Sequence, residues 1–153
     1  MLRPPAFTRE NTMIKADIIH PQLLGALALC GHKTQILIAD GNYSFVTNSS
    51  KEATIVYLNL APGMIASSVI LDKVLKHINV EHASMMAWPQ DFTNTIATEY
   101  QQLLPDGCPI DYLNREAFYH AAKSQETLLV IASGEMRRFA NLLLTVAPVS
   151  LAD

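Results

Sequence analysis

The order of hydrophobic and polar residues along the chain predicts alternating helices and strands. Short uninterrupted apolar runs, as in residues 36–39, are typical of buried strands. Leu23, Leu27 and Cys30 instead recur at the spacing of one helix face. The predicted helices cover 20–31, 64–78, 92–104 and 114–124, and the predicted strands cover 36–39, 53–60, 82–89, 109–113, 127–133 and 141–148. Helices between buried strands favour an α/β fold of three layers, helix–sheet–helix, around a largely parallel sheet.

The length of the chain predicts one domain with an arm in front of it. Residues 1–12 are expected to form a flexible N-terminal arm, because the pair Pro4-Pro5 disfavours a helix and polar residues follow. Residues 13–153 then form a single α/β domain, since 153 residues are about the size of one domain and half of them are hydrophobic.

Charge and composition narrow the classes of function. A formal net charge of -3 gives no electrostatic reason to expect nucleic acid or an anionic membrane as partner. No apolar run approaches the roughly 20 residues of a spanning helix, and the N-terminus lacks the apolar stretch of a signal peptide. The two cysteines, Cys30 and Cys108, have no metal-ligand spacing. We therefore expect a cytoplasmic protein.

Sequence motifs for cofactors and metals are missing from the chain. The sequence contains no GxGxxG, no P-loop lysine pattern and no GxSxG. His77 and His82 lie five residues apart across a helix–strand junction, which is the wrong spacing for a shared metal face. We expect neither a cofactor nor a metal.

Polar residues at the junctions between predicted elements are the remaining candidates for chemistry. In α/β sheets, ligands bind outside the carboxyl ends of strands, where Asp40, Ser133 and Glu135 are expected to lie. Each also has a structural explanation, as a turn-forming residue, a helix cap or a pair of solvated side chains on one helix face. From residue types and spacing alone, the function stays open between a small-molecule enzyme and a binding module. The candidates are His32, Asp40, Arg115, Tyr119, Ser133, Glu135 and Asn141.

Three motifs, in this order, resemble the ribose pyranase and fucose mutarotase family. The first is LLGALALCGHKTQILIAD (23–40), with a helix, Gly-His, an apolar strand and Asp. The second is LNREAFYHAA (113–122), which resembles the fucose-type branch. The third is IASGEMRRFANLLLTVAP (131–148), similar to the family's C-terminal Gly-Glu, aromatic, small residue and Asn. The resemblance extends from about residue 14 to residue 148.

This resemblance implies an isomerase that interconverts sugar anomers or ring forms without a cofactor. It also implies a ring-shaped homo-oligomer, of which a decamer is one size, with sites at subunit boundaries. His32 and Asp40 match the family's active-site positions and are the expected catalytic residues. Ring opening needs groups that exchange protons, and the pKa of an unperturbed histidine, about 6.5, suits His32 to this role. The expected substrate-binding residues are Arg115, Tyr119, Phe139 and Asn141.

Two features of the sequence keep alternatives open. A strand of four or five residues spans roughly 13–17 Å, so His32 and Asp40 meet only if the chain bends or if they come from different subunits. The chain also has Phe139 where the family usually has tyrosine, and Thr34 where it commonly has aspartate. The leading hypothesis is a fucose-mutarotase-like enzyme acting on a monosaccharide. The alternatives are a non-catalytic monosaccharide-binding relative and ribose pyranase-type specificity.

Overall fold

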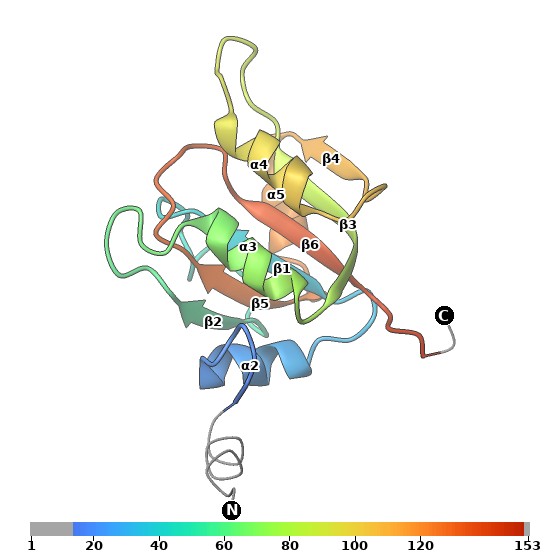
Figure 1. Ribbon diagram of the computed structural model, residues 1–153. Helices are drawn as coiled ribbons and strands as arrows, with labels where there is room; N and C mark the ends of the chain where they lie inside the picture. The colour runs from blue at the N-terminus through green and yellow to red at the C-terminus, as the bar shows by residue number, and fades with distance from the viewer. Residues whose placement is uncertain (1–13, 152–153) are drawn as a thin grey trace, which may run out of the picture.

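The computed structural model describes residues 14–151, so the expected arm at 1–12 lies outside the described residues. Within them, the helices and strands follow one another in the predicted order (Figure 1). The helices are α2 (Pro21–Ala28), α3 (Ser67–Leu75), α4 (Thr95–Leu103) and α5 (Arg115–Ala122). The strands are β1 (Gln35–Ala39), β2 (Thr54–Tyr57), β3 (Asn79–Met86), β4 (Ile110–Leu113), β5 (Thr127–Ala132) and β6 (Leu142–Ala147).

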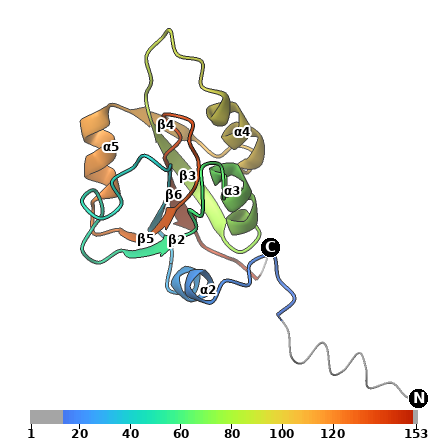
Figure 2. The ribbon, with the colours of Figure 1, turned by 90° about the vertical axis from the view of Figure 1, so that its left-hand side faces the viewer.

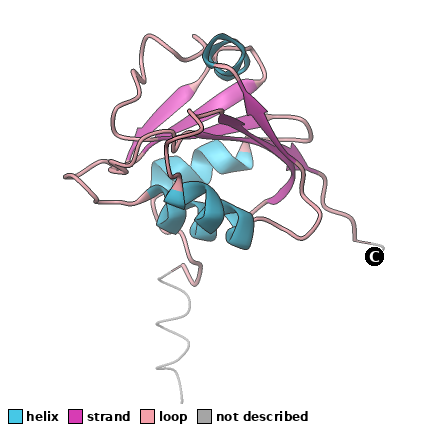
Figure 3. Cartoon of the chain, turned by 90° about the horizontal axis from the view of Figure 1, so that it is seen from above, coloured by secondary structure: helices cyan, strands magenta, loops and turns pink. Residues whose placement is uncertain are grey.

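The six strands form one mixed sheet with the order β2-β5-β1-β6-β3-β4. β1, β2 and β5 are mutually parallel, as are β3 and β4, whereas β6 is antiparallel to both of its neighbours. Helices cover both faces, with α5 on one face and the other helices on the opposite one (Figures 2 and 3). The predicted three-layer α/β fold with a largely parallel sheet is therefore confirmed.

The sheet separates two hydrophobic cores. In β1, Ile36 and Ile38 pack into the core beneath α2, α3 and α4, whereas Leu37 and Ala39 pack into the core beneath α5. All four side chains are fully buried. Burial on both faces explains why this strand is a continuous apolar run and not an alternating one. Phe118 of α5 fills the second core, as its apolar character predicts.

The strand register gathers the candidate residues at one edge of the sheet. Because β1 and β5 are parallel and Ala39 lies opposite Ala132, the residues that follow them, Asp40 and Ser133, emerge side by side. β6 runs the other way beside β1, so its first residue, Leu142, lies opposite Ile38. The antiparallel direction of β6 thus brings the start of this strand to the carboxyl end of β1.

Side-chain caps fix where three of the helices begin. His20 Nδ1 accepts the backbone N–H of Leu23 (3.1 Å) at the start of α2. Asn114 accepts a hydrogen bond from the backbone N–H of Ala117 (2.8 Å), so α5 begins at Arg115, as the sequence predicts. Asn94 caps α4 in the same way through the N–H of Ala97 (2.9 Å). No helix among residues 14–151 is long and apolar enough to cross a membrane.

Candidate functional site

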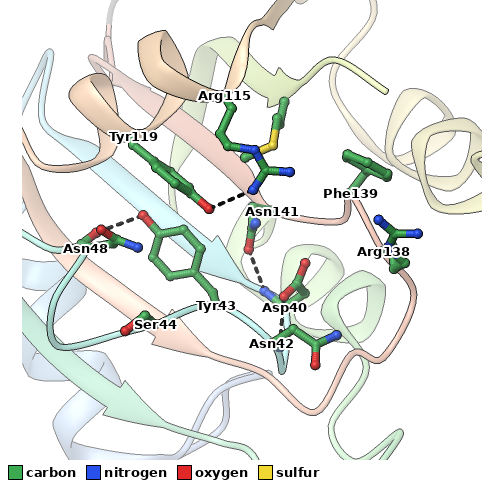
Figure 4. A pocket seen from close by; sticks show the side chains of 11 residues that line it. Asp40, Asn42, Tyr43, Ser44, Asn48, Arg115, Tyr119, Arg138, Phe139 and Asn141 are labelled. Atoms are coloured by element: carbon green, nitrogen blue, oxygen red, sulfur yellow. Dashed lines mark hydrogen bonds between the residues drawn. The ribbon is translucent and has the colours of Figure 1, made fainter. Parts of the chain in front are cut away.

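A polar pocket of about 250 Å³ opens at the edge of the sheet where β1 ends and β6 begins (Figure 4). Its walls come from the loop after β1, the first turns of α5, the end of β3 and the loop before β6. Of the six residues expected to be catalytic or substrate-binding, all except His32 line this pocket. The lining residues are Asp40, Asn42, Tyr43, Ser44, Asn48, Met86, Arg115, Tyr119, Arg138, Phe139 and Asn141.

Asp40 is the buried carboxylate of this pocket. Only 5% of the residue is exposed, and its Oδ1 accepts the backbone N–H of Asn42 (2.9 Å). Burial raises the pKa of the carboxyl group above 3.8, and the charge of Glu135 adds to this, while backbone hydrogen bonds oppose it. Asp40 therefore holds a proton more readily than an exposed aspartate, which suits proton exchange with a substrate.

Asn141 lies beside Asp40 and positions its backbone. The Oδ1 of Asn141 accepts the N–H of Asp40 (2.8 Å), which fixes the orientation of the amide. The Nδ2 group donates no hydrogen bond to any residue in 14–151 and lines the pocket. The Oδ1 atom of Asn141 thus has a structural role, whereas its Nδ2 group can donate a hydrogen bond to a ligand in the pocket.

Arg115 and Tyr119 form a pair one turn apart on α5. Arg115 Nη1 donates to the hydroxyl oxygen of Tyr119 (3.2 Å). This bond uses an acceptor position of Tyr119 and leaves the phenolic proton available to the pocket. Tyr43, the other tyrosine of the pocket, donates its proton to the carbonyl oxygen of Asn48 (2.7 Å), and burial raises its pKa. Of the two tyrosines, Tyr119 is therefore the one able to donate a proton to a ligand.

Phe139 lines the pocket and is not a buried core residue. It is half-buried, adopts a positive φ of 57°, and packs its ring against Phe92 at 5.1 Å between centroids. A residue other than glycine rarely adopts such a φ, and residues that do are concentrated at functional sites. The carbonyl oxygen of Phe139 accepts the Nδ2 group of Asn94 (3.1 Å), which ties the loop to the start of α4.

Beneath the pocket, Glu135 anchors the loop that carries Arg138, Phe139 and Asn141. Its carboxylate is 6% exposed and accepts Nε of Arg137 (2.8 Å) and the hydroxyl of Ser67 (3.1 Å). Burial raises its pKa, but the hydrogen bonds and charge of Arg137 outweigh this effect, so the pKa lies below 4.5. The carboxylate is ionised at neutral pH and serves as an internal support.

The backbone and Ser133 complete this support. The carbonyl oxygen of Glu135 accepts the N–H of Gly41 (2.6 Å), next to Asp40. Ser133 is fully buried and donates its hydroxyl to the carbonyl oxygen of Ala39 (2.6 Å). Neither Ser133 nor Glu135 lines the pocket. Both sequence candidates therefore position the site without facing a ligand in it.

His32 lies away from the pocket, before the opposite end of β1. Its Nε2 pairs with Glu81 Oε1 at 3.0 Å, and its side chain is 47% exposed. It lines a different hollow with Cys30 and His77. Because β1 is extended between them, His32 and Asp40 do not meet within one chain. Of the two arrangements that the sequence left open, a bend in the chain is excluded.

Some lining residues were not identified from the sequence. Asn42, Ser44 and Asn48 belong to a polar segment that was predicted as a loop next to the end of β1, so its position was foreseeable. No sequence pattern indicated that Arg138 lines the pocket, because a single arginine in a charged loop is equally typical of a solvent-exposed position. Among residues 14–151, no group of three or more His, Cys, Asp or Glu side chains could hold a metal ion.

Comparison with known proteins shows where this chain belongs. Residues 13–149 match the model of the RbsD / FucU transport protein family. The chain belongs to the RbsD / FucU family. A separate search of curated proteins found no match.

Solved RbsD and FucU structures have the same fold. RbsD from Bacillus subtilis, complexed with D-ribose, is 25% identical with a TM-score of 0.74, covering 90% of this chain and 100% of that one. FucU from Bifidobacterium longum is 29% identical with a TM-score of 0.75, covering 86% and 96%. The fucose mutarotase from Streptococcus pneumoniae, complexed with L-fucose, is 24% identical with a TM-score of 0.75, covering 91% and 99%, and supports the fold alone. The resemblance found in the sequence is confirmed.

Proposed function

We propose that the protein is a mutarotase that interconverts the anomers of a monosaccharide by opening and closing its ring. The observation that carries this proposal is the polar pocket, in which buried Asp40 lies among the donors Arg115, Tyr119 and Asn141. The family supports it, since one RbsD structure contains D-ribose and one relative is a fucose mutarotase.

The residues of the pocket suit the two proton transfers of ring opening. A base removes the proton of the anomeric hydroxyl, and an acid donates a proton to the ring oxygen as the C–O bond breaks. The open chain then rotates about the bond to its carbonyl carbon and closes on the other face. Asp40 in its ionised form is the proposed base, and the free phenolic proton of Tyr119 is the proposed acid. Arg115 and Asn141 hold hydroxyl groups of the sugar.

His32 enters this mechanism from a second copy of the chain. None of the five histidines of the sequence lines the Asp40 pocket, and β1 separates His32 from Asp40 in one chain. A ring-shaped homo-oligomer, whose subunit contacts bring His32 of one copy to the pocket of the next, supplies an imidazole. This imidazole gives a proton to Tyr119 once Tyr119 has passed its own to the ring oxygen, and it takes the proton back when the ring closes. His32 is sufficiently exposed for this contact.

Two observations favour a second candidate, a sugar-binding protein without catalysis. The pocket of one chain has no histidine, and Phe139 supplies a ring without a hydroxyl group. Such a protein retains the hydroxyl-binding residues Arg115 and Asn141 and lacks an efficient acid–base pair. A preference for ribose ring forms is less favoured, because the motif with Arg115, Phe118 and Tyr119 resembles the fucose-type branch.

Magnetisation-exchange NMR on free sugars distinguishes the two candidates. With L-fucose and D-ribose as probes, a mutarotase increases the exchange rate between the two anomer signals above that of the buffer. A binding protein gives saturation transfer from protein to sugar and leaves the exchange rate at the buffer value. The second result, obtained with both sugars, contradicts the proposed activity.

Phe139→Tyr is expected to raise the anomer exchange rate with little change in sugar affinity. Phe139 already lines the pocket, so the added hydroxyl supplies a further proton donor with a pKa of about 10. The matched control is Phe92→Tyr, which adds the same group to the neighbouring ring outside the pocket lining. Exchange rates and thermal melting are measured for both variants. A lower melting temperature in Phe139→Tyr without a faster exchange contradicts this role of the position.

A further inference from the structure

The pocket around Asp40 carries more positive than negative charge. Its charged side chains are Asp40, Arg115 and Arg138, so two guanidinium groups face one carboxylate. The whole chain, in contrast, has a net charge of -3. The positive charge is therefore a local property of the pocket and not part of a generally basic surface.

Arg115 and Arg138 differ from the third arginine of the described residues in their partners. Arg137 bonds to Glu135 (2.8 Å) and Glu99 (2.6 Å), so its charge is compensated within the chain. Within residues 14–151, neither Arg115 nor Arg138 has a carboxylate oxygen within 4.0 Å. These two charges therefore line the pocket without forming an ion pair to any described residue.

Aromatic rings hold the two guanidinium groups and leave donors free. Arg138 lies over the rings of Phe139 (5.2 Å) and Phe92 (6.0 Å), and Arg115 lies over the ring of Tyr119 (6.0 Å). A guanidinium group has five N–H donors, of which Arg115 uses one on the hydroxyl oxygen of Tyr119. Arg138 donates no side-chain hydrogen bond to any described residue, and Figure 4 shows both arginines among the side chains around the pocket.

We propose that the pocket binds a monosaccharide with an anionic substituent, either the carboxylate of a uronic acid or a phosphate ester. Arg138 binds this substituent and the charge of Arg115 adds to the attraction, while Arg115, Asp40 and Asn141 contact the hydroxyl groups. The inference rests on the proposed function, because it names the substrate class of the same pocket.

Three properties of the pocket support this substrate class. An arginine binds a carboxylate or phosphate through two parallel hydrogen bonds, which are stronger than those to a neutral hydroxyl. The pocket volume of about 250 Å³ lies below the roughly 300–1,000 Å³ of pockets for drug-sized ligands, so it suits one small sugar. The surplus of one positive charge matches the single charge of a carboxylate, which makes the uronic acid the favoured form.

Calorimetric titration of the full chain with matched sugars tests the inference. The probes are galactose, galacturonate and galactose 6-phosphate, with glucose, glucuronate and glucose 6-phosphate as a second series. For at least one series, the wild-type protein is expected to bind the acid about tenfold more tightly than its parent sugar, a ratio that charge-assisted hydrogen bonds readily provide. This preference is expected to weaken between about 20 mM and about 300 mM salt.

Two variants assign the preference to the pocket. In Arg138→Gln the ratio between acid and parent sugar is expected to fall to roughly twofold or less, because only one guanidinium group remains. Lys123→Gln also removes one positive charge, but at the far end of α5 and outside the pocket lining, and is expected to keep the wild-type ratio. Thermal melting is measured on both variants, since Arg138 is exposed and its replacement is expected to leave the fold intact.

Each outcome decides for or against the inference. A preference for the sugar phosphate alone, lost in Arg138→Gln, supports an anionic substrate and identifies phosphate as its charge. Equal affinity for acids and parent sugars, or a preference that Arg138→Gln leaves unchanged, overturns it. Accelerated anomer exchange of a neutral sugar without any preference for anions overturns this inference and leaves the mutarotase proposal standing. No binding and no exchange with any of the sugars overturns both.

Discussion

Asp40→Asn is expected to lower the anomer exchange rate by roughly 10²–10⁴-fold, the contribution that a positioned acid–base group typically makes. The asparagine keeps the shape of the side chain and can still accept the N–H of Asn42, but it cannot take up a proton. Sugar affinity is expected to change far less than the rate. The measurement is magnetisation exchange between anomer signals at saturating sugar.

The melting temperature of Asp40→Asn shows whether a slower exchange comes from the lost carboxylate or from a damaged fold. Burial raises the pKa of Asp40 in the folded protein, so the protonated form favours folding at low pH, and this contribution is lost as pH rises through the raised pKa. At neutral pH the neutral asparagine is therefore expected to leave the melting temperature unchanged or higher. A slower exchange that accompanies a lower melting temperature contradicts a purely chemical role.

The pH dependence of the anomer exchange rate follows from the raised pKa of Asp40. Asp40 acts as a base only when it is ionised, so the wild-type exchange rate above the buffer is expected to fall as pH drops through its pKa. Because that pKa is raised, the fall occurs above pH 3.8. A fall at or below that value, in a protein that stays folded, contradicts Asp40 as the base.

Glu135→Gln is expected to destabilise the fold by about 2–3 kcal/mol, since it removes the charge of a buried carboxylate that pairs with half-buried Arg137 and accepts the hydroxyl of Ser67. For a chain of this size, the melting temperature should fall by roughly 4–12 °C. The loss arises because the amide nitrogen replaces one of the two carboxylate oxygens, so its N–H groups meet either the Ser67 hydroxyl or the Arg137 Nε, each of which already donates to this position. Urea or thermal unfolding measures the effect.

Glu99→Gln is the matched control for this prediction. Glu99 pairs with the same Arg137, but its side chain is 42% exposed against 6% for Glu135. Exposed ion pairs contribute about 0–1 kcal/mol, so this variant is expected to be nearly as stable as the wild type. Equal losses in the two variants would contradict the view that burial of Glu135 makes it the anchor of the loop.

The sequence predicted those parts of the fold and site that depend on local patterns. The apolar run of β1 and the cap at Asn114 are local signals, and they placed Asp40 at a strand end and Arg115 at a helix start. The direction of β6 was not predictable in this way, because an apolar run is the same pattern in a parallel and an antiparallel strand. The hydrogen bond between Asp40 and Asn141, 101 residues apart, depends on that direction.

His32 and Arg138 show a second limit of prediction from one sequence. A strand's length fixes the separation of His32 from Asp40 within one chain, but no sequence pattern shows whether a second copy of the chain contributes a residue to the pocket. Arg138 lies in the pocket because its loop is held by Glu135 and Asn94. Such support comes from distant parts of the chain, so the charge of the pocket emerges only from the folded structure.

The most direct test of a mutarotase pocket completed by a second copy is complementation between two variants. His32→Ala and Asp40→Asn are each expected to exchange anomers at the buffer rate. The two variants are then co-expressed with different tags, and mixed oligomers are isolated through both tags. Random mixing in a symmetric ring restores about a quarter of the sites, so the mixture is predicted to regain about that fraction of the wild-type rate. Mixed oligomers that stay as inactive as either variant alone would contradict the shared site.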